Sequence, residues 1–483
     1  MVFSLFLTLC LFNPQNQADV IESMKVDFVL LDVLALDKDG LPVMDLTKDD
    51  FEIKENKKKV TVQVFDILDF SIPAAEDEGE ADATDSTDEQ EVPMGSEAAE
   101  PPSPAQTVIM LLELSNAEHF AVSETMNQVG RFLTDLQGRP NLQIFIFSMD
   151  KGLITKDFTP SPEKALADFN AFKETYLKDS TRNLSVVRAT TLASFEENLD
   201  DCKGGAEFVA QQQNRAPGES ARLSKDQIIE YLGCLVQRYD VFTKTQTQRT
   251  RSVLFALENL IAGFSKVQGL KSLYLVSPGF SLYPGQTAAN MARAYQDRVV
   301  GRFSPGQSQD VGSPFGNPDD GGVGDGNPNG QRKRVERPPR VSFSKTSLVD
   351  EYERVTHAAV AQRVVFNTFT VPMDYAQIRQ GAGAQDLGLA DDALQYYSFF
   401  GEEQNTGLAK LAEFTGGIPR FGRNLAEELR ATVEGSRYFY VLGYETPKGN
   451  AKKFRKISIK CKRNGVTLHH RQGYHPDPEK LKR

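Results

Sequence analysis

Residues 107–120 of the chain read TVIMLLELSNAEHF, and this segment decides the fold. Its first part, Thr107–Leu112, is apolar and predicts a buried strand that ends abruptly at the carboxylate of Glu113. Apolar residues then recur at helical spacing, at Val122, Met126, Val129, Leu133 and Leu136. Ligands of open α/β sheets bind beyond the carboxyl ends of the strands, so the junction at Glu113 is the first place to look for a functional site.

Strand-like and helical segments alternate from residue 105 to residue 437, which is typical of a parallel sheet with crossover helices. Further strands are predicted at residues 142–150 (LQIFIFSMD), 270–277 (LKSLYLVS) and 364–371 (VVFNTFTV). Their long apolar runs fit strands that are covered on both faces. The expected fold class is therefore α/β, with a doubly wound, mostly parallel sheet and flanking helices.

Helices are predicted between and after these strands. One of them carries Val253, Leu257, Leu260, Ile261 and Phe264 on a single face. Another is expected near residues 348–362. Asn424, followed three residues later by Glu427, predicts the start of the last helix as a variant of the capping box.

The two ends of this region are β-rich. Residues 24–70 predict strands with a turn at Asp39 and Gly40 and a hairpin turn at Glu55 and Asn56, and residues 438–475 predict three more strands. Each flank is too small to bury a core alone. We therefore expect the two flanks to pair in one small β-sandwich of immunoglobulin-like type.

Three segments have the composition of linkers or insertions. Residues 71–104 are rich in Ala, Asp, Glu, Ser and Pro, and residues 283–344 in Gly, Pro, Asn and Asp. Such segments cannot bury enough apolar surface to offset chain entropy, so both are predicted to be disordered. Residues 160–248 predict a helical, polar insertion.

The net charge of −11 comes from one of these segments. Residues 76–100 contain eleven carboxylates and no Lys or Arg. Outside this segment 55 acidic residues face 55 basic residues, so the rest of the chain is neutral. No basic surplus exists to attract nucleic acid or an anionic membrane, and neither partner is expected.

The first residues predict export. Val2–Phe12 is an apolar run too short to span a bilayer, and it is typical of a secretory signal peptide, predicted here as residues 1–18 with cleavage near Ala18. A buried first strand and a lipoprotein signal at Cys10 are the alternatives. No later segment is apolar enough to span a membrane, so the mature chain is expected to be periplasmic or extracellular.

Export also predicts a disulfide between Cys202 and Cys234, because thiols oxidise outside the cytosol. Cys10 leaves with the signal peptide, and Cys461 lies in a separate strand. In the alternative interpretation, Cys234 is a buried free thiol and Cys202 an exposed one.

Motifs of enzymes are missing from the sequence. It contains no G-x-S-x-G, H-E-x-x-H, C-x-x-C or phosphate-binding Gly-Lys-Ser/Thr loop. His469 and His470 are adjacent on a predicted strand and so point to opposite faces, which argues against a zinc site with His475. We expect no enzymatic activity, no cofactor and no bound metal.

Four segments, in this order, resemble exported bacterial proteins with a von Willebrand factor type A (VWA)-related domain, of the kind abundant in acidobacteria. They are VDFVLLDVLALDKDGLPVMDLTKDDFEIKENKKKV (26–60), LVSPGFSLYPG (275–285), LAKLAEFTGG (408–417) and YFYVLGYETPKGNAKKFRKISIKCKRNGVTLHHRQGY (438–474). The resemblance covers most of the chain outside the insertions and implies a VWA-like fold.

The resemblance also implies a metal-ion-dependent adhesion site at the carboxyl edge of the sheet. Its ligands would be an Asp-x-Ser-x-Ser motif, a Thr from a second loop and a later Asp. In this chain Glu113 and Ala117 stand at the first and last motif positions, and Pro278 stands where the later Asp belongs. Thr247 or Thr250 would supply the Thr. Because Mg²⁺ needs near-ideal octahedral oxygen geometry, we expect a degenerate site.

The function expected from these observations is protein–protein interaction through this edge, with an unidentified protein partner. The edge residues are Glu113, Ser115, Asn116, Ala117, His119, Thr250, Ser277 and Pro278. Glu113 and Ser115 could instead simply cap the following helix. The loops after Phe280 and Ser398 add aromatic candidates. The alternatives are a metal site rebuilt around Glu113 and a cell-envelope hydrolase with its active residues within 160–248.

Overall fold

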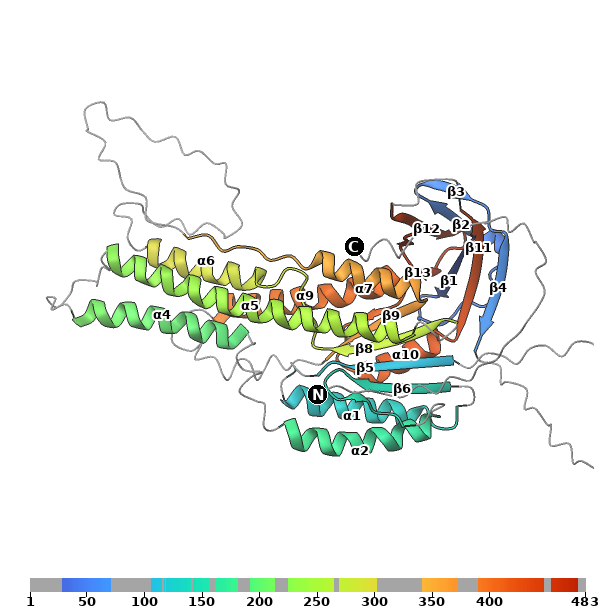
Figure 1. Cartoon of the computed structure of the whole chain (residues 1–483), viewed down its shortest axis with the longest axis horizontal. Helices are drawn as coiled ribbons and strands as arrows, with labels where there is room; N and C mark the ends of the chain where they lie inside the picture. The colour runs from blue at the N-terminus through green and yellow to red at the C-terminus, as the bar shows by residue number, and fades with distance from the viewer. Residues whose placement is uncertain are drawn as a thin grey trace, which may run out of the picture.

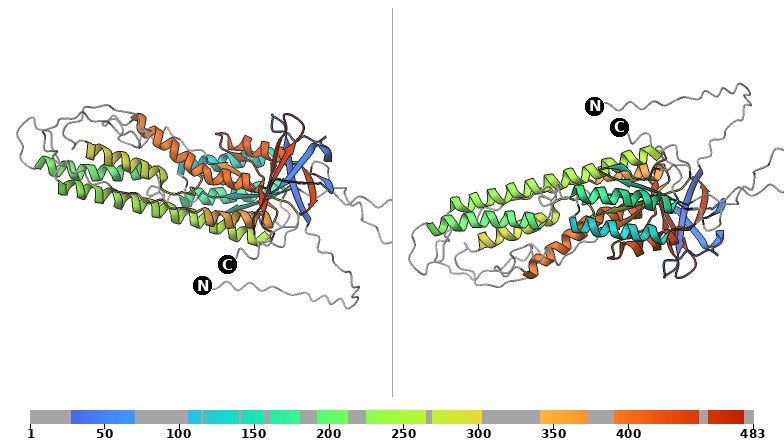
Figure 2. Two further views of the ribbon diagram at one scale, coloured as in Figure 1. Left: turned by 90° about the horizontal axis from the view of Figure 1, so that it is seen from above. Right: turned by 90° about the horizontal axis from the view of Figure 1, so that it is seen from below.

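The computed structural model describes residues 28–70, 106–114, 117, 119–139, 142–156, 161–180, 192–212, 225–264, 269–301, 341–371, 390–446 and 453–476. These residues form one six-stranded sheet, two four-stranded sheets and a set of helices. Figures 1 and 2 place the two smaller sheets at one end of the large sheet and a group of projecting helices at the other end.

The large sheet has the strand order β10-β9-β8-β5-β6-β7. Its strands are β5 (Gln106–Leu112), β6 (Leu142–Ser148), β7 (Gly152–Leu153), β8 (Lys271–Ser277), β9 (Val364–Thr370) and β10 (Pro419–Arg420). All neighbours pair in parallel except β7, which is antiparallel to β6. The prediction of an α/β fold with a mostly parallel sheet is confirmed.

Helices cover both faces of the large sheet. On one face α1 (His119–Asp135), α2 (Pro162–Ser180) and α10 (Leu425–Gly435) pack on β5 residues such as Met110. On the other face α5 (Lys225–Gly263), α7 (Val349–Ala361) and α9 (Ala390–Thr415) pack on residues such as Leu111. Successive residues of a strand point to opposite faces, so the continuous apolar run of β5 packs against the helices on both faces of the sheet.

The predicted start of α10 is confirmed. The Asn424 side chain accepts a hydrogen bond from the Glu427 backbone N–H at 3.4 Å, and its amide donates to the Glu427 carboxylate at 2.9 Å. These contacts satisfy one of the backbone donors that a helix leaves free at its N-terminus.

A helical arm extends beyond the sheet, and we define it as α4 (Leu192–Gln212), α6 (Gln286–Gly301) and the N-terminal parts of α5 and α9 (Figure 1). Its own apolar core includes Leu199, Leu235, Ala292 and Tyr397. The predicted helical insertion is thus only partly separate. Its helix α2 belongs to the α/β layer, and α5 runs without a break for 39 residues from the arm onto the sheet.

The prediction of disorder for residues 283–344 is wrong in its first part. Helix α6 occupies 16 residues of it, and apolar residues of this helix recur at helical spacing and are buried in the arm. They are Ala288, Ala289, Met291, Ala292 and Tyr295. The Gly, Pro, Asn and Asp residues that suggested disorder follow later. Residues 302–340, the predicted linker 71–104 and the predicted signal peptide 1–18 lie outside the described residues.

The predicted disulfide is confirmed and holds α4 against α5. Cys202 and Cys234 are bonded across a sequence separation of 32 residues, with 5.9 Å between their Cα atoms. Cys461 is free, as expected.

Replacement of both Cys202 and Cys234 by Ala is expected to destabilise the arm by about 3 to 4 kcal/mol, because the bond restricts the unfolded loop. Urea unfolding followed by hydrogen exchange within α4 measures the loss, with Cys461→Ala as the control. Mass spectrometry of the exported protein, alkylated without reduction, should find neither Cys202 nor Cys234 modified. Their alkylation would count against both the disulfide and export.

The two smaller antiparallel sheets form the sandwich, with strand orders β13-β1-β11-β4 and β14-β12-β2-β3. From the N-terminal flank come β1 (Phe28–Leu36), β2 (Phe51–Glu55), β3 (Lys58–Val60) and β4 (Val64–Asp69). From the C-terminal flank come β11 (Tyr438–Glu445), β12 (Arg455–Cys461), β13 (Thr467–His470) and β14 (Gly473–Tyr474). β1 pairs with β11 and β13, and β2 pairs with β12. The flanks share one apolar core that contains Leu31, Ile53, Leu442 and Ile459.

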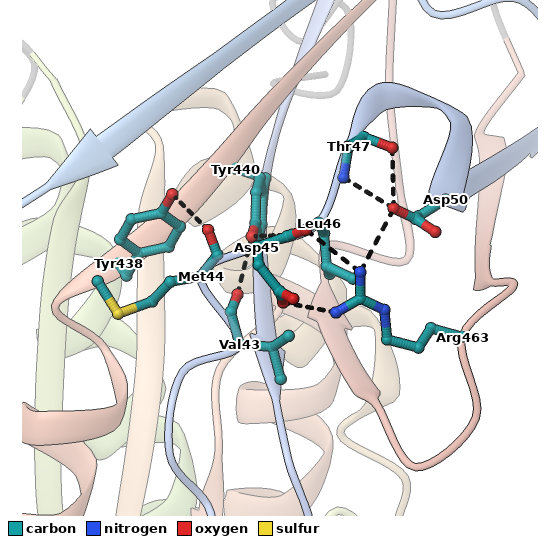
Figure 3. Close-up of polar contacts among 9 residues, drawn as sticks. All are labelled: Val43, Met44, Asp45, Leu46, Thr47, Asp50, Tyr438, Tyr440 and Arg463. Carbon is teal, nitrogen blue, oxygen red and sulfur yellow. Dashed lines mark hydrogen bonds and ion pairs between the residues drawn. The ribbon is translucent and has the colours of Figure 1, made fainter.

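Two tyrosines of β11 hold the loop that joins β1 to β2 (Figure 3). The Tyr440 hydroxyl accepts a hydrogen bond from the Leu46 backbone N–H at 2.9 Å and donates one to the Val43 carbonyl at 2.8 Å. The Tyr438 hydroxyl donates to the Met44 carbonyl at 3.1 Å. The C-terminal flank therefore satisfies backbone groups of a loop in the N-terminal flank, as buried groups require.

A further contact closes the other end of this loop. Arg463, which follows β12, pairs with Asp45 and lies 3.9 Å from the Asp50 carboxylate (Figure 3). Both ion pairs are exposed and contribute little to stability.

The sandwich meets the α/β domain at an aromatic joint that contains two histidines. The rings of His357 on α7 and His475 after β14 lie 4.5 Å apart edge to face. Phe454 contacts both histidine rings, and Phe414 contacts His357. Burial, helped by His475, lowers the pKa of His357 to about 4. Burial also lowers the pKa of His475, against the opposing influence of Glu353.

The joint should lose stability in acid. Between about pH 6.5 and 4, His357 is protonated in the unfolded chain but stays neutral in the folded one. The free energy of unfolding should therefore fall as the pH drops through this range. The contribution of His357 is at most about 3 kcal/mol. Urea unfolding at several pH values measures the free energy of unfolding as a function of pH. In this window it should change less with pH for His357→Phe than for the wild type, and an equal pH dependence would contradict the assignment.

Candidate functional site

The carboxyl edge of the large sheet contains its topological switch point. The chain passes from β5 to its neighbour β6 and later adds β8 on the other side of β5. In open α/β sheets, ligands bind outside the carboxyl ends of the strands at such a switch point, here the ends of β5 and β8. Glu113 directly follows β5 and Ser277 ends β8. The structure therefore brings these two predicted site residues together.

Glu113 is fully buried and bonded to the β8 segment. Its backbone N–H donates to the Val276 carbonyl at 2.9 Å, and its carboxylate accepts a hydrogen bond from the Ser277 hydroxyl at 2.8 Å. The Ser277 oxygen also accepts from the Gly279 N–H at 3.0 Å. Gly279 has φ +95°, and a Cβ on it would lie 2.9 Å from the Gln404 carbonyl oxygen, so only glycine fits there.

Arg249 of α5 is a member of this site that the sequence analysis missed. Its guanidinium Nη2 donates to the Gly279 carbonyl at 3.2 Å, while its buried Nε–H has no hydrogen-bond partner within the described part of the chain. Burial lowers the pKa of Arg249 and the Glu113 carboxylate raises it. An arginine remains protonated under such opposing influences, so the edge contains a fixed positive charge.

A second group of polar residues lies at the end of β6. The Ser148 hydroxyl donates to the Asp150 carboxylate. Burial, then the neighbouring Asp150 carboxylate, and more weakly Glu113 raise the pKa of Tyr176 on α2, which therefore stays a neutral phenol. Together the two groups form what we call the edge cluster. Its members are Glu113, Ser148, Asp150, Tyr176, Arg249 and Ser277.

The other predicted site residues have different positions. Pro278 and Ala117 are buried. Thr250 is buried on α5, directly after Arg249. Ser115 and Asn116 lie outside the described residues, as does the side chain of His119, whose backbone begins α1.

The residues at the edge do not fit a Mg²⁺ site. Pro278 and Ala117 have no side-chain oxygen, and one oxygen of Glu113 is already bonded to Ser277. The positive charge of Arg249 would further oppose a divalent cation. Within the described ranges no group of three or more His, Cys, Asp or Glu residues could hold a metal ion.

The histidines of the C-terminal flank have separate partners, as predicted for adjacent strand residues. His470 Nε2 accepts from the Ile459 backbone N–H at 3.3 Å, inside the sandwich. His469 instead interacts with the backbone of Gly417 next to β10. Their side chains therefore point away from each other.

Two exposed aromatic side chains follow members of the edge cluster closely in the sequence, Phe120 after Glu113 and Tyr283 after Ser277. Phe120, in the first turn of α1, is 51% exposed, and Tyr283, in the segment after β8, is 40% exposed. The ammonium of Lys410 lies 5.9 Å from the Tyr283 ring centroid. Phe280 itself is buried, and Ser398 lies inside α9 rather than in the predicted loop.

A hollow lies elsewhere, on the face of the sheet that α1, α2 and α10 cover. A cleft of about 600 Å³ is lined by residues of α1, α2 and α10 such as Asn127, Lys173 and Arg430. The ammonium of Lys173 donates to the Asn127 amide oxygen at 2.7 Å. The ammonium of Lys173 is thus already paired inside the cleft, and no member of the edge cluster lines it.

Comparisons with known proteins add little to this description. No protein-family model matches the sequence, and it matches none of the curated proteins. A solved structure of the human COPII-coat protein Sec24c is similar with a TM-score of 0.27 and 9% sequence identity, over 77% of this chain. This chain spans 43% of the length of that chain. A likeness at this level carries no argument about function. No described helix is both long and apolar enough to cross a membrane.

Proposed function

We propose that this chain is a non-enzymatic exported protein, related to VWA-domain proteins, that binds another protein through the carboxyl edge of its large sheet. The observation that carries the proposal is that two aromatic side chains, Phe120 and Tyr283, are exposed in the segments that follow the ends of β5 and β8. Aromatic residues are enriched in protein interfaces, where they supply apolar area at a low cost in side-chain entropy.

The proposed VWA relationship rests on the four sequence segments quoted above. The six-stranded, mostly parallel sheet with helices on both faces is compatible with it. Under the proposed relationship, the edge cluster would correspond to the position of the adhesion site of VWA domains. Its contacts between Glu113 and Ser277 favour a degenerate site over a working metal centre.

Export is proposed from the apolar N-terminal run, and the Cys202–Cys234 disulfide supports it. Disulfides of this structural kind persist in oxidising compartments and are rare in the cytosol. The proposed location is therefore the periplasm or the outside of the cell.

A pull-down from bacterial envelope extracts tests the proposed function. The wild-type chain and the variant Phe255→Ser, altered at an aromatic that is 65% exposed on α5, should retain the same protein, with or without chelator. The double variant Phe120→Ser, Tyr283→Ser should retain on the order of tenfold less of it. Equal retention by all three would reject the edge as the interface. Turnover of peptidoglycan by the wild-type chain would favour the hydrolase.

A further inference from the structure

The edge cluster contains a continuous chain of contacts from a cation to a carboxylate. Arg249 donates to the Gly279 carbonyl, the Gly279 N–H donates to Ser277, and Ser277 donates to Glu113, at 3.2, 3.0 and 2.8 Å. This series of hydrogen bonds links α5 to the loop after β8 and to the end of β5. It therefore joins three elements at the switch point of the sheet.

The charge of Glu113 needs a counter-charge at this position. The residue is 0% exposed, and a buried carboxylate is costly unless hydrogen bonds and an opposite charge compensate it. Ser277 supplies a hydrogen bond without charge. The guanidinium of Arg249 supplies the charge, because it lies at the other end of the same contact chain.

We infer that the Arg249 guanidinium is the permanent cation of this sheet edge and takes the role that a divalent metal ion has at an adhesion site. This explains why residues without a ligand oxygen stand at two positions where an adhesion site has metal ligands. On this inference Pro278 and Ala117 need no side-chain oxygen, because the cation of the edge is a side chain of the protein itself. The comparison with an adhesion site rests on the proposed VWA relationship, whereas the pairing of Arg249 with Glu113 does not depend on the proposed protein binding.

Two consequences follow. First, Glu113 and Arg249 should be energetically coupled, since removing either one takes the opposite charge away from the other, which is partly or fully buried. Second, divalent ions should not stabilise the folded protein, because a ligand that binds only the folded state would raise its stability.

A double-mutant cycle on the full chain tests the coupling. Glu113→Gln, Arg249→Met and the double variant are unfolded in urea, in EDTA and in millimolar MgCl2 or MnCl2. Each single variant should lower the folding equilibrium constant on the order of tenfold or more, and the double variant should lose much less than the product of the two losses. Arg251→Met is the matched control, because Arg251 is two residues away on α5, half-exposed and paired with Glu351 at 3.2 Å.

Several results would overturn the inference. Losses that multiply in the double variant would show that the two residues act independently. A Glu113→Gln variant as stable as the wild type would show that Arg249 needs no carboxylate, and this holds even if Arg249→Met fails to fold. One-to-one Mn²⁺ binding by the wild type, detected by electron paramagnetic resonance and lost in Glu113→Gln, would assign the edge to a metal instead.

Discussion

Truncation of the chain after Pro447 is expected to unfold the N-terminal strands, although none of their residues is removed. Strand β2 would lose its partner β12, and β1 would lose β13 on one side. The shared core would lose Ile457 and Ile459, both buried, each worth about 1.5 to 3 kcal/mol. Of the sheet β14-β12-β2-β3 only β2 and β3 would remain, and an isolated pair of short strands is marginally stable at best.

Hydrogen exchange measured by mass spectrometry gives the clearest test. The amides of β2, Phe51–Glu55, should exchange slowly in the full chain and without protection in the truncated one. A chain that ends after Pro476 keeps all eight strands of the sandwich and serves as the control. Slow exchange of β2 in the chain without β12 would show that the N-terminal flank folds alone.

Periodicity along the sequence was sufficient to predict the large sheet and most of its helices. The apolar runs of β5, β8 and β9 are buried on both faces, as long uninterrupted runs require. The cap at Asn424 marks its helix start by local chemistry alone. Features that depend on a few neighbouring residues are those that a single sequence encodes most directly.

The candidate site was only partly predictable. Glu113 and Ser277 could be placed at the edge because both end apolar strands. Arg249 could not, because its position depends on α5 continuing for 39 residues from the arm onto the sheet. An arginine in a polar stretch of helix has no local feature that distinguishes it from an exposed one, so only the tertiary contact with Gly279 identifies it.

Glu55 is a second residue whose environment could not be predicted from the sequence. The sequence predicts it in the hairpin turn, whereas the structure makes Asn56 and Lys57 the turn residues, both with positive φ, and leaves Glu55 as the last residue of β2. It is 3% exposed inside the sandwich. The partners that make this burial tolerable come from about four hundred residues later in the chain, which periodicity cannot detect.

Replacement of Glu55 by Ala is expected to destabilise the sandwich by about 3 to 5 kcal/mol, because it breaks a buried ion pair and leaves its cation uncompensated. The Glu55 carboxylate accepts hydrogen bonds from Arg455 at 2.9 Å, Tyr444 at 2.9 Å and Tyr474 at 3.1 Å. The Arg455 side chain is only 8% exposed. Water therefore cannot replace the lost carboxylate, and the two hydroxyls lose their acceptor as well.

Urea unfolding of Glu55→Ala and two further variants tests this explanation. It distinguishes the destabilisation caused by leaving the Arg455 charge buried alone from the stability that the intact ion pair contributes. Glu52→Ala, which removes a partly exposed partner of Lys54 in the same strand, should change stability little. Glu55→Met combined with Arg455→Met should recover most of the loss of Glu55→Ala, since an apolar pair of similar size has no charge to compensate. A double variant as unstable as Glu55→Ala would mean that the tyrosine hydroxyls, and not the charge of Arg455, determine the cost.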